Sequence, residues 1–504
     1  MTRTTIDGTR ALFTPGAVTR AMRTVSANGH TPAIPFDPAS GVPYYTQIYN
    51  GYRTAILSGR LSPGQRLPST RTLAEEFHIS RFPVLSAFDQ LLQDGYLVGK
   101  VGSGTFVRDP VPDELSKPIA GRLPSPRALP SIDQGPLPGE SLGLFTVGLP
   151  ALDRFPHRVF SRLVRHHASV GSPQLLAYGD PAGYPPLREA ITDYLRTARA
   201  VDCDPSQVLI VTGSQMALVI SAIALTTPES TVCVEEPGYP GAQLALAMGG
   251  ANIIRVGVDE DGIDVTAIRQ VPDPINVVYV TPSHQFPLGA SLEMVRRIEL
   301  LSWAARRHAW IVEDDYDSEY RYSMRPLGAL QGMDADERVI YVGTFSQALF
   351  PALRIGYMVV PRALVSEFVR IREGLDICPP TLFQLVLTDF LNQGHFARHL
   401  RRMRSIYLAR RDALISAIQR HAADVLMLCN TDAGTHLVAL LPNDVDDREV
   451  VRRAAEHRMY PKALSTCYAT TGASTGLILG YGGSDECALT RGVQVLAEII
   501  RELR

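Results

Sequence analysis

Clusters of glycine and polar residues follow short apolar stretches in this 504-residue chain, from about residue 212 onward. One of them, Thr212-Gly213-Ser214-Gln215, comes after an apolar stretch and opens a helical one. The unpaired N–H groups and the dipole at the start of a helix favour an anion such as phosphate. Many turns of this kind bind nothing, so this cluster alone is a weak signal.

Acidic residues follow another apolar stretch, in Glu313-Asp314-Asp315-Tyr316-Asp317. A carboxylate in this place could pair with a protonated ring nitrogen of a ligand. A surface turn or a helix cap accounts for the same residues equally well when the segment is considered alone. The segment therefore indicates a ligand site only in combination with the other clusters.

Further segments of this kind add an aromatic ring, hydroxyl groups and a basic residue. They are Glu235–Tyr239, Thr281–Gly289, and Gly343–Gln347 with Arg354–Tyr357 after it. In parallel sheets, ligands lie at the carboxyl ends of the strands. We therefore expect these segments to contribute to one ligand site.

Lysine is scarce in this chain, although basic residues are not. Of 49 basic side chains, 46 are arginines, and the lysines are Lys100, Lys117 and Lys462. The 51 acidic residues bring the formal net charge to -2, and the composition is that of an ordinary globular protein. Any chemistry that needs a lysine amine therefore has three candidates.

The polar clusters need a scaffold, and the pattern from about Leu142 to the C-terminus predicts one. Short strands alternate there with longer helical stretches, which is typical of a mostly parallel sheet covered by helices. The predicted strands are Gln207–Val211, Thr231–Val234, Asn276–Thr281, Trp310–Glu313 and Val339–Val342.

A smaller unit with a different pattern precedes this scaffold. Ser69 and Ser80 each come before a helical pattern as plausible N-caps, and the short connection between the helices predicts a helix-turn-helix. Two strand-like runs with a glycine-rich tip follow and indicate a wing. Residues 41–108 carry six Arg and one Lys against two Glu and two Asp, a net charge of +3. A basic solvated face would explain the charge alone, but charge, helices and wing together favour DNA binding.

These patterns divide the chain into four parts. Residues 1–41 are expected to be a loosely ordered N-terminal arm, and residues 42–108 the DNA-binding domain. Residues 109–141 hold eight prolines, which keep a linker extended. Residues 142–504 form the large domain, with a small C-terminal subdomain from about residue 390.

The sequence indicates a cytoplasmic protein. It contains no secretion signal and no apolar stretch long enough to span a membrane. The six cysteines are far apart and form no CxxC pair, so we expect reduced thiols with neither a disulfide framework nor a metal site.

Residues 44–108 resemble the winged helix-turn-helix domain of the GntR superfamily, on the pattern from Ser58 to Val107. In that family small polar residues usually follow Ser-Arg, and here Phe82 and Pro83 stand in their place, so apolar or weaker base readout is expected there. The resemblance implies DNA contacts by Ser69, Arg71, Ser80, Arg81 and Pro83 from the helices, and by Lys100, Ser103 and Gly104 from the wing.

The large domain resembles the aminotransferase fold, which is fold type I of the pyridoxal phosphate enzymes. The fold class implied is therefore an α+β winged helix joined to an α/β aminotransferase-like domain with a small α+β subdomain. This joined architecture, together with the segment Tyr178–Arg188, resembles the MocR family of bacterial transcription regulators.

The same resemblance assigns roles around a pyridoxal phosphate cofactor. Phosphate contacts fall to Gly213, Ser214, Gln215, Ser346 and Arg354, and a ring-stacking contact to Tyr239. Asp314 would pair with the ring nitrogen, with Asp315 as a rival, and Tyr316 and His284 would lie near the phenolic oxygen. Tyr178 would reach into the site of the partner subunit of a homodimer.

One position departs from the family pattern in its chemistry. The family motif reads Gly-Thr-Phe-Ser-Lys, and its lysine forms the Schiff base with the cofactor, but this chain has Gln347 there. An amide nitrogen is delocalised and cannot form an imine, so no catalytic residue remains at this position. Gln347 is explained either by a natural variant or by an engineered change. Leu288 in place of a threonine, and Ile478 where many aminotransferases have an arginine for the substrate carboxylate, favour the natural variant.

The leading hypothesis is a homodimeric, non-enzymatic transcription regulator that binds a double-stranded DNA operator. Its large domain would sense pyridoxal phosphate, bound weakly and non-covalently, or an amine or amino-acid adduct of it. Lys462 is the other lysine of the large domain. The resemblance implies that its segment lies near the site entrance, where a solvated lysine is favoured over a cofactor-binding one. Two alternatives are an aminotransferase with a fused DNA-binding domain, and a DNA binder whose large domain only dimerises and binds no cofactor.

Overall fold

The computed structural model describes residues 23–25, 34–110, 142–169, 171, 176–272, 274–322, 328–469 and 474–504. The chain forms two compact units, residues 1–127 and residues 128–504, each described by itself below. The prolines of the predicted linker between 112 and 138, and Lys117, lie outside the described residues.

The first unit is built on three helices and a β-hairpin. Helices α1 (Tyr44–Leu57), α2 (Thr70–Phe77) and α3 (Arg81–Gln93) enclose one apolar core, in which the rings of Tyr52 and Phe88 meet edge to face. Ser69 caps α2 by accepting the Thr72 N–H at 3.1 Å, as predicted. Ser80 is the cap residue of α3 but makes no such side-chain bond.

A wing follows α3. Strands β3 (Leu97–Lys100) and β4 (Gly104–Val107) pair antiparallel, and Ser103 N–H closes the turn by donating to Lys100 O at 2.9 Å. The segment before α2 joins this hairpin, because Leu67 N–H donates to Thr105 O and Val107 N–H donates to Gln65 O. Backbone hydrogen bonds therefore hold the wing to the segment that connects α1 and α2.

Part of the predicted N-terminal arm belongs to the core of this unit. Strand β1 (Arg23–Val25) pairs antiparallel with β2 (Ile34–Phe36), and both Ile34 and Phe36 are buried against the helices. A Cβ on Gly51 of α1 would come within 2.9 Å of the Ile34 side chain, so the helix approaches the strand closely. The loosely ordered arm expected for residues 1–41 is thus corrected at residues 34–41. A three-residue strand is too short to be evident from periodicity.

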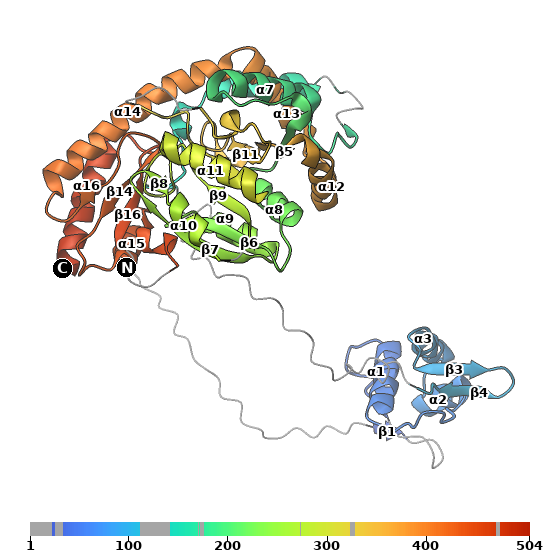
Figure 1. Cartoon of the computed structure of the whole chain (residues 1–504). Coiled ribbons are helices and arrows are strands. Elements are labelled where there is room, and N and C mark those ends of the chain that lie inside the picture. The colour runs from blue at the N-terminus through green and yellow to red at the C-terminus, as the bar shows by residue number, and fades with distance from the viewer. Residues whose placement is uncertain are drawn as a thin grey trace, which may run out of the picture. The chain divides into compact units, whose positions relative to one another are not determined.

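The second unit contains an eight-stranded sheet in the order β5-β12-β11-β10-β9-β6-β7-β8. Figure 1 labels several of its strands, among them β6, β7 and β9. Neighbours from β7 to β11 run parallel, whereas β12 is antiparallel to both β11 and β5. All five predicted strands are present in it, most of them longer at the carboxyl end. The bounds are β5 (Val208–Val211), β6 (Thr231–Glu236), β7 (Asn252–Asp259), β8 (Gly262–Ile263), β9 (Ile275–Val280), β10 (Trp310–Asp315), β11 (Val339–Thr344) and β12 (Gly356–Val359).

Helices cover both faces of the sheet because its central strands are apolar on both sides. Along β5, Leu209 and Val211 pack on one face with α8 (Ser214–Leu225), α9 (Pro240–Met248) and α12 (Val365–Asp376). Val208 and Ile210 pack on the other face, which is covered by α5 (His157–Ser169), α7 (Pro185–Arg199) and α13 (Thr381–Asn392).

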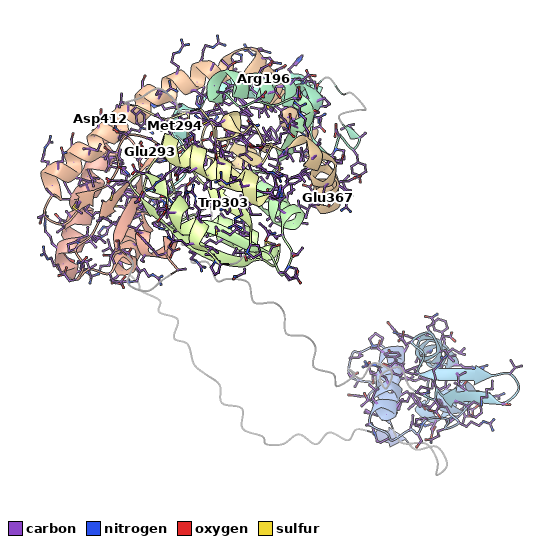
Figure 2. The ribbon with its side chains drawn as sticks, viewed as in Figure 1. Arg196, Glu293, Met294, Trp303, Glu367 and Asp412 are labelled. Carbon is purple, nitrogen blue, oxygen red and sulfur yellow. The ribbon has the colours of Figure 1, made fainter. Side chains whose placement is uncertain are left out.

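Two more helices extend the cover on the side of β9 and β10. They are α10 (Val265–Gln270) and α11 (Met294–Arg307). Helix α11 begins after Glu293, leaves Met294 half exposed and buries Trp303 (Figure 2).

The C-terminal part forms a second, smaller sheet in the order β13-β14-β16-β15. The long helix α14 (His395–His421) leads to it from α13 and packs on α16, as Figure 1 shows. Phe145, far away in sequence, pairs with Gly480 and lies in the core of this subdomain. The remaining bounds are β13 (Met427–Leu428), β14 (His436–Leu440), α15 (Asp447–Glu456), β15 (Lys462–Ala463), β16 (Gly476–Gly480) and α16 (Glu486–Leu503).

Within the part of the chain that the structure describes, no helix combines the length and the apolar character needed to cross a membrane.

Candidate functional site

The polar segments predicted from the sequence meet at one edge of the large sheet. Strands β5, β6, β9, β10 and β11 end there with their carboxyl ends, as expected for a ligand site. The antiparallel β12 begins at the same edge, because Gly356 lies opposite both Val211 and Thr344. Arg354, which precedes β12 in sequence, is therefore brought to the same edge.

A cavity of about 420 Å³ lies at this edge. Eight of the predicted cofactor-site residues line it: Ser214, Gln215, Tyr239, Asp314, Tyr316, Ser346, Gln347 and Arg354. The other lining residues are Val147, Gly148, Tyr279, Thr281, Phe286, Thr344, Pro351, Thr435, His436 and Lys462.

The structure separates the two adjacent aspartates at the end of β10. Asp314 faces the cavity, where its Oδ2 accepts the Tyr279 hydroxyl at 2.9 Å and its Oδ1 has no hydrogen-bond partner among the described residues. Asp315 points to the opposite face of the strand and accepts Arg199 Nε at 2.7 Å. Asp314 is thus the carboxylate available to a ligand, and Asp315 is held in a buried ion pair.

Burial raises the pKa of Asp314 to about 7, and the Tyr279 hydrogen bond opposes part of that rise. Nearby Glu235 is also buried, and its pKa is raised to about 7 despite hydrogen bonds from the Thr281 hydroxyl and N–H. A cationic group placed beside Asp314 would restore its charged form, because an opposite charge at short range favours ionisation.

One end of the cavity is suited to an anion. Helix α8 begins after Gly213, and the first N–H groups of a helix have no intrahelical partner. Gly213 has φ +92°, and a Cβ there would come within 2.9 Å of the Arg354 guanidinium. The Arg354 guanidinium also donates a hydrogen bond to Thr212 O, so it packs against the residues that precede α8. Gly213 is therefore required for both its conformation and its contact, although its own atoms do not line the cavity.

A hydrogen-bonded group lies beside Tyr316. The Tyr316 hydroxyl is 3.0 Å from Nδ1 of the buried His284, and this nitrogen is also 3.0 Å from both carboxylate oxygens of Asp317. His284 itself does not line the cavity and acts on it through Tyr316. His436 does line it, and burial, followed by the neighbouring His284, lowers the pKa of His436 to about 4.

Ligand atoms of His284, Asp317 and His436 lie within 4.8 Å of one another, a spacing that metal ligands share. The sequence predicted no metal site. The hydrogen bonds from His284 to Asp317, and from His436 Nε2 to Pro287 O at 3.1 Å, account for the same arrangement without an ion.

An aromatic pair borders the cavity. The rings of Tyr239 and Phe286 meet edge to face with centroids 5.7 Å apart. Tyr239 is the cap residue of α9, so the start of this helix fixes its position. The pair provides an apolar surface against which a planar ligand ring could pack.

Gln347 lies in the turn after β11 and projects into the cavity. Its Oε1 is buried without a hydrogen-bond partner among the described residues, and its Nε2 is 3.0 Å from the place that a Cβ on Gly148 would occupy. Gln347 therefore brings an amide to the cavity wall whose oxygen makes no hydrogen bond within the described residues.

Several lining residues were not evident from the sequence. Tyr279 lies within a strand, and Thr435 and His436 come from the C-terminal subdomain. Only the tertiary fold brings these residues to the sheet edge. Lys462, for which a solvated side chain was favoured, is instead half-buried in the cavity wall. Tyr178 is 81% exposed and does not line the cavity of its own chain.

The predicted DNA-contacting residues lie on the surface of the first unit. Seven are exposed, namely Ser69, Arg71, Ser80, Arg81, Lys100, Ser103 and Gly104, and Pro83 is half-buried. Arg81 Nε donates to the Thr70 hydroxyl at 3.0 Å, which joins the starts of α2 and α3. Phe82 is 76% exposed, and Val101 at the wing tip is fully exposed. Two apolar side chains thus stand on the surface that carries the basic residues.

Two family models match the chain, one in each unit. Residues 44–107 match the bacterial regulatory proteins of the gntR family, and residues 154–461 match aminotransferase class I and II. Among solved structures, the chain is similar to the α-aminoadipate aminotransferase LysN from Thermus thermophilus, in complex with N-(5'-phosphopyridoxyl)-L-leucine. That match has 27% identity and a TM-score of 0.67, and covers 72% of this chain and 93% of the other.

Relatives of similar length are transcription regulators. The probable rhizopine catabolism regulatory protein MocR of Rhizobium meliloti is 39% identical over 91% of this chain and 94% of its own length. The pyridoxine biosynthesis transcriptional regulator PdxR of Corynebacterium glutamicum is 32% identical over 92% of this chain and 96% of its own length. The chain therefore belongs to the MocR-type transcription regulators, in which a GntR winged helix is joined to an aminotransferase class I and II domain.

Proposed function

We propose that this regulator senses pyridoxal phosphate, or an amine or amino-acid adduct of it, through a large domain that binds the ligand without a covalent bond. The observation that carries the proposal is that the groups suited to a phosphopyridine line one cavity, while the family's lysine position is Gln347. The protein is accordingly a ligand-responsive DNA binder and not an aminotransferase.

The residues of the cavity fit such a cofactor. The unpaired Oδ1 of Asp314 suits a protonated ring nitrogen, and the start of α8 with Ser346 and Arg354 suits a phosphate. Tyr239 would pack on the ring and the Tyr316 hydroxyl would bind its phenolic oxygen. When bound, pyridoxal phosphate supplies an electron-poor ring and an aldehyde that reacts with amines.

Gln347 changes what the chain itself can do. A carboxamide neither attacks an aldehyde nor accepts a proton at neutral pH, so it gives no nucleophile and no general base. Its unpaired Oε1 can accept a hydrogen bond from an amine of the ligand. Gln347 would therefore select a ligand that brings its own N–H group.

Regulation requires that the ligand bind two arrangements of the protein with different affinities. We infer a homodimer in which exposed Tyr178 reaches the partner's cavity and two DNA-binding units contact two half-sites. The segment 109–141 joins the two units and is the element through which ligand binding would alter their arrangement.

The test is a titration of the full-length protein with pyridoxal phosphate, followed by borohydride reduction and intact mass measurement. We expect saturable binding without a covalent adduct in the wild type, and a reducible adduct in Gln347→Lys. A reduced adduct on the wild-type chain would contradict non-covalent binding.

Two further assays separate the alternatives. Repeated transamination turnovers by the wild type would support the aminotransferase hypothesis. An operator affinity that saturating pyridoxal phosphate leaves unchanged would instead support a large domain that serves only for dimerisation.

A further inference from the structure

Lys462 brings a positive charge to the cavity from the C-terminal subdomain. It lies on β15, is half-buried and lines the cavity together with Gln347 and Asp314. Its Nζ is 5.9 Å from the centre of the Phe286 ring. The amine is therefore part of the ligand site rather than of the outer surface.

No carboxylate of the described residues lies within 4.0 Å of Lys462 Nζ. Asp314, an acidic residue of the cavity wall, already accepts the Tyr279 hydroxyl. The nearby Phe286 ring offers only a weak cation–π contact, worth about 0.5–2 kcal/mol in general. A half-buried ammonium with so little compensation is well placed to bind an anion of a ligand.

The described neighbours of Lys462 on the small sheet are mostly apolar, apart from the buried thiol of Cys467, whose pKa is raised by burial and partly lowered by the nearby Lys462. Ile478 lies opposite Lys462 in the antiparallel pair of β15 and β16, so the two side chains are on the same face of the small sheet. Ile478 is buried in an apolar cluster with Phe286, Val438 and Leu464. A ligand that reaches this wall therefore meets one charged group on an apolar surface.

The positive charges of the cavity come from two different parts of the fold. Arg354 lies beside the start of α8 at the large sheet, and Lys462 comes from the small one. We propose that Lys462 binds a carboxylate of the ligand, so that the ligand is an amino acid or its phosphopyridoxyl adduct and not a simple amine. This inference rests on the proposed function of the cavity and adds the chemical class of the ligand.

A pair of probes that differ only in the carboxylate tests the inference. The probes are N-phosphopyridoxyl-L-alanine and its carboxamide, and calorimetry measures their affinities for full-length protein. We expect the wild type to bind the acid at least about tenfold more tightly, as for a charge-assisted hydrogen bond. Lys462→Met should abolish this preference and leave the affinity for the amide unchanged.

Arg448→Met is the matched control. Arg448 lies in the same subdomain on α15, is exposed and does not line the cavity. Its loss removes the same charge from the chain, so a general electrostatic effect would appear in both variants. We expect the control to keep the wild-type preference for the acid.

Other results overturn the inference in distinguishable ways. An equal preference for the acid in wild type and Lys462→Met contradicts a carboxylate contact at Lys462. Equal losses of affinity for both probes in that variant indicate that Lys462 only supports the cavity wall. If the wild type binds neither probe, the proposed function of the cavity fails, and the carboxylate contact fails with it.

Discussion

Asp314 and Asp315 are adjacent in sequence, but Asp314 lines the cavity whereas Asp315 forms a buried ion pair with Arg199. Each carboxylate has one oxygen without a hydrogen-bond partner among the described residues, but Oδ2 of Asp315 is bound by the Arg199 cation and the Tyr341 hydroxyl, whereas Oδ2 of Asp314 is bound only by the Tyr279 hydroxyl. A buried carboxylate without a cation beside it is costly, so the charge of Asp314 depends on pH and on a ligand.

We predict that Asp314→Asn reduces the pH dependence of stability of the ligand-free protein. Burial raises the Asp314 pKa from 3.8 to about 7, so between these values the native carboxyl holds a proton that the unfolded chain has lost. Stability therefore falls as pH rises through this window, by up to about 1.4 kcal/mol per pH unit for one such group. Denaturant unfolding at pH 5, 6 and 7 measures the slope.

Other buried carboxyls contribute to the same slope, because the pKa values of Glu235, Glu313 and Glu319 are also raised to about 7 by burial. Asp314→Asn should thus remove only the contribution of one carboxyl group to the pH dependence of the free energy of unfolding. Asp424→Asn is the control, since Arg501 lowers the pKa of exposed Asp424 to about 2, well below the window. An unchanged slope in Asp314→Asn would contradict the assignment.

At the scale of elements, the ion pair of Arg199 and Asp315 connects the last turn of α7 to the end of β10. Both side chains are nearly inaccessible, and Arg199 also donates to Ser283 Oγ at 2.7 Å. This connection holds Asp315 on one face of β10 and so keeps Asp314 on the cavity face.

We predict that Arg199→Met destabilises the large unit by about 3–5 kcal/mol, because it leaves a buried carboxylate without its cation. Chemical denaturation followed by tryptophan fluorescence measures the change, since Trp303 lies in this unit. Arg501→Met, which breaks an exposed pair with Asp424, should leave the free energy of unfolding close to that of the wild type. A similar small effect in both variants would mean that the buried pair contributes little.

The sequence predicted the main elements and most cavity residues, because strand ends and helix starts have local patterns. The family resemblance favoured Asp314 over Asp315, but the local pattern alone does not separate them, since that depends on which face of β10 each residue occupies in the folded sheet. Tyr279 and His436 reach the cavity only through contacts between distant elements, and the half-buried place of Lys462 in its wall depends on the same contacts. The core positions of Ile34 and Phe36 depend in the same way on packing against α1.

At the scale of the whole molecule, the winged helix and the proposed ligand cavity belong to different units of one chain. The DNA-binding residues 41–108 carry a net charge of +3 within a chain of -2. A single winged helix of this charge gives limited affinity at physiological salt, because phosphate contacts are screened. Tight binding therefore requires two such units on one operator.

We predict that a dimer loses at least about 100-fold in affinity when one of two half-sites is scrambled, because the second unit no longer binds at a high effective concentration. Fluorescence anisotropy at fixed salt, on an operator selected with the full-length protein, measures this. Arg81→Ala should weaken binding to both DNAs by removing a basic contact of α3. Equal affinity for one and two half-sites would contradict the dimeric arrangement.

The scarcity of lysine gives the protein a practical property. Lys100 is exposed at the wing, where its Nζ is 5.0 Å from the centre of the Phe106 ring, and Lys462 lies in the cavity wall. An amine-directed reagent will therefore modify one reporter in each functional region, and the 46 arginines will not react with it. Bound DNA should shield the first amine and a bound acid the second, so a single labelling reaction read by peptide mass monitors both forms of occupancy.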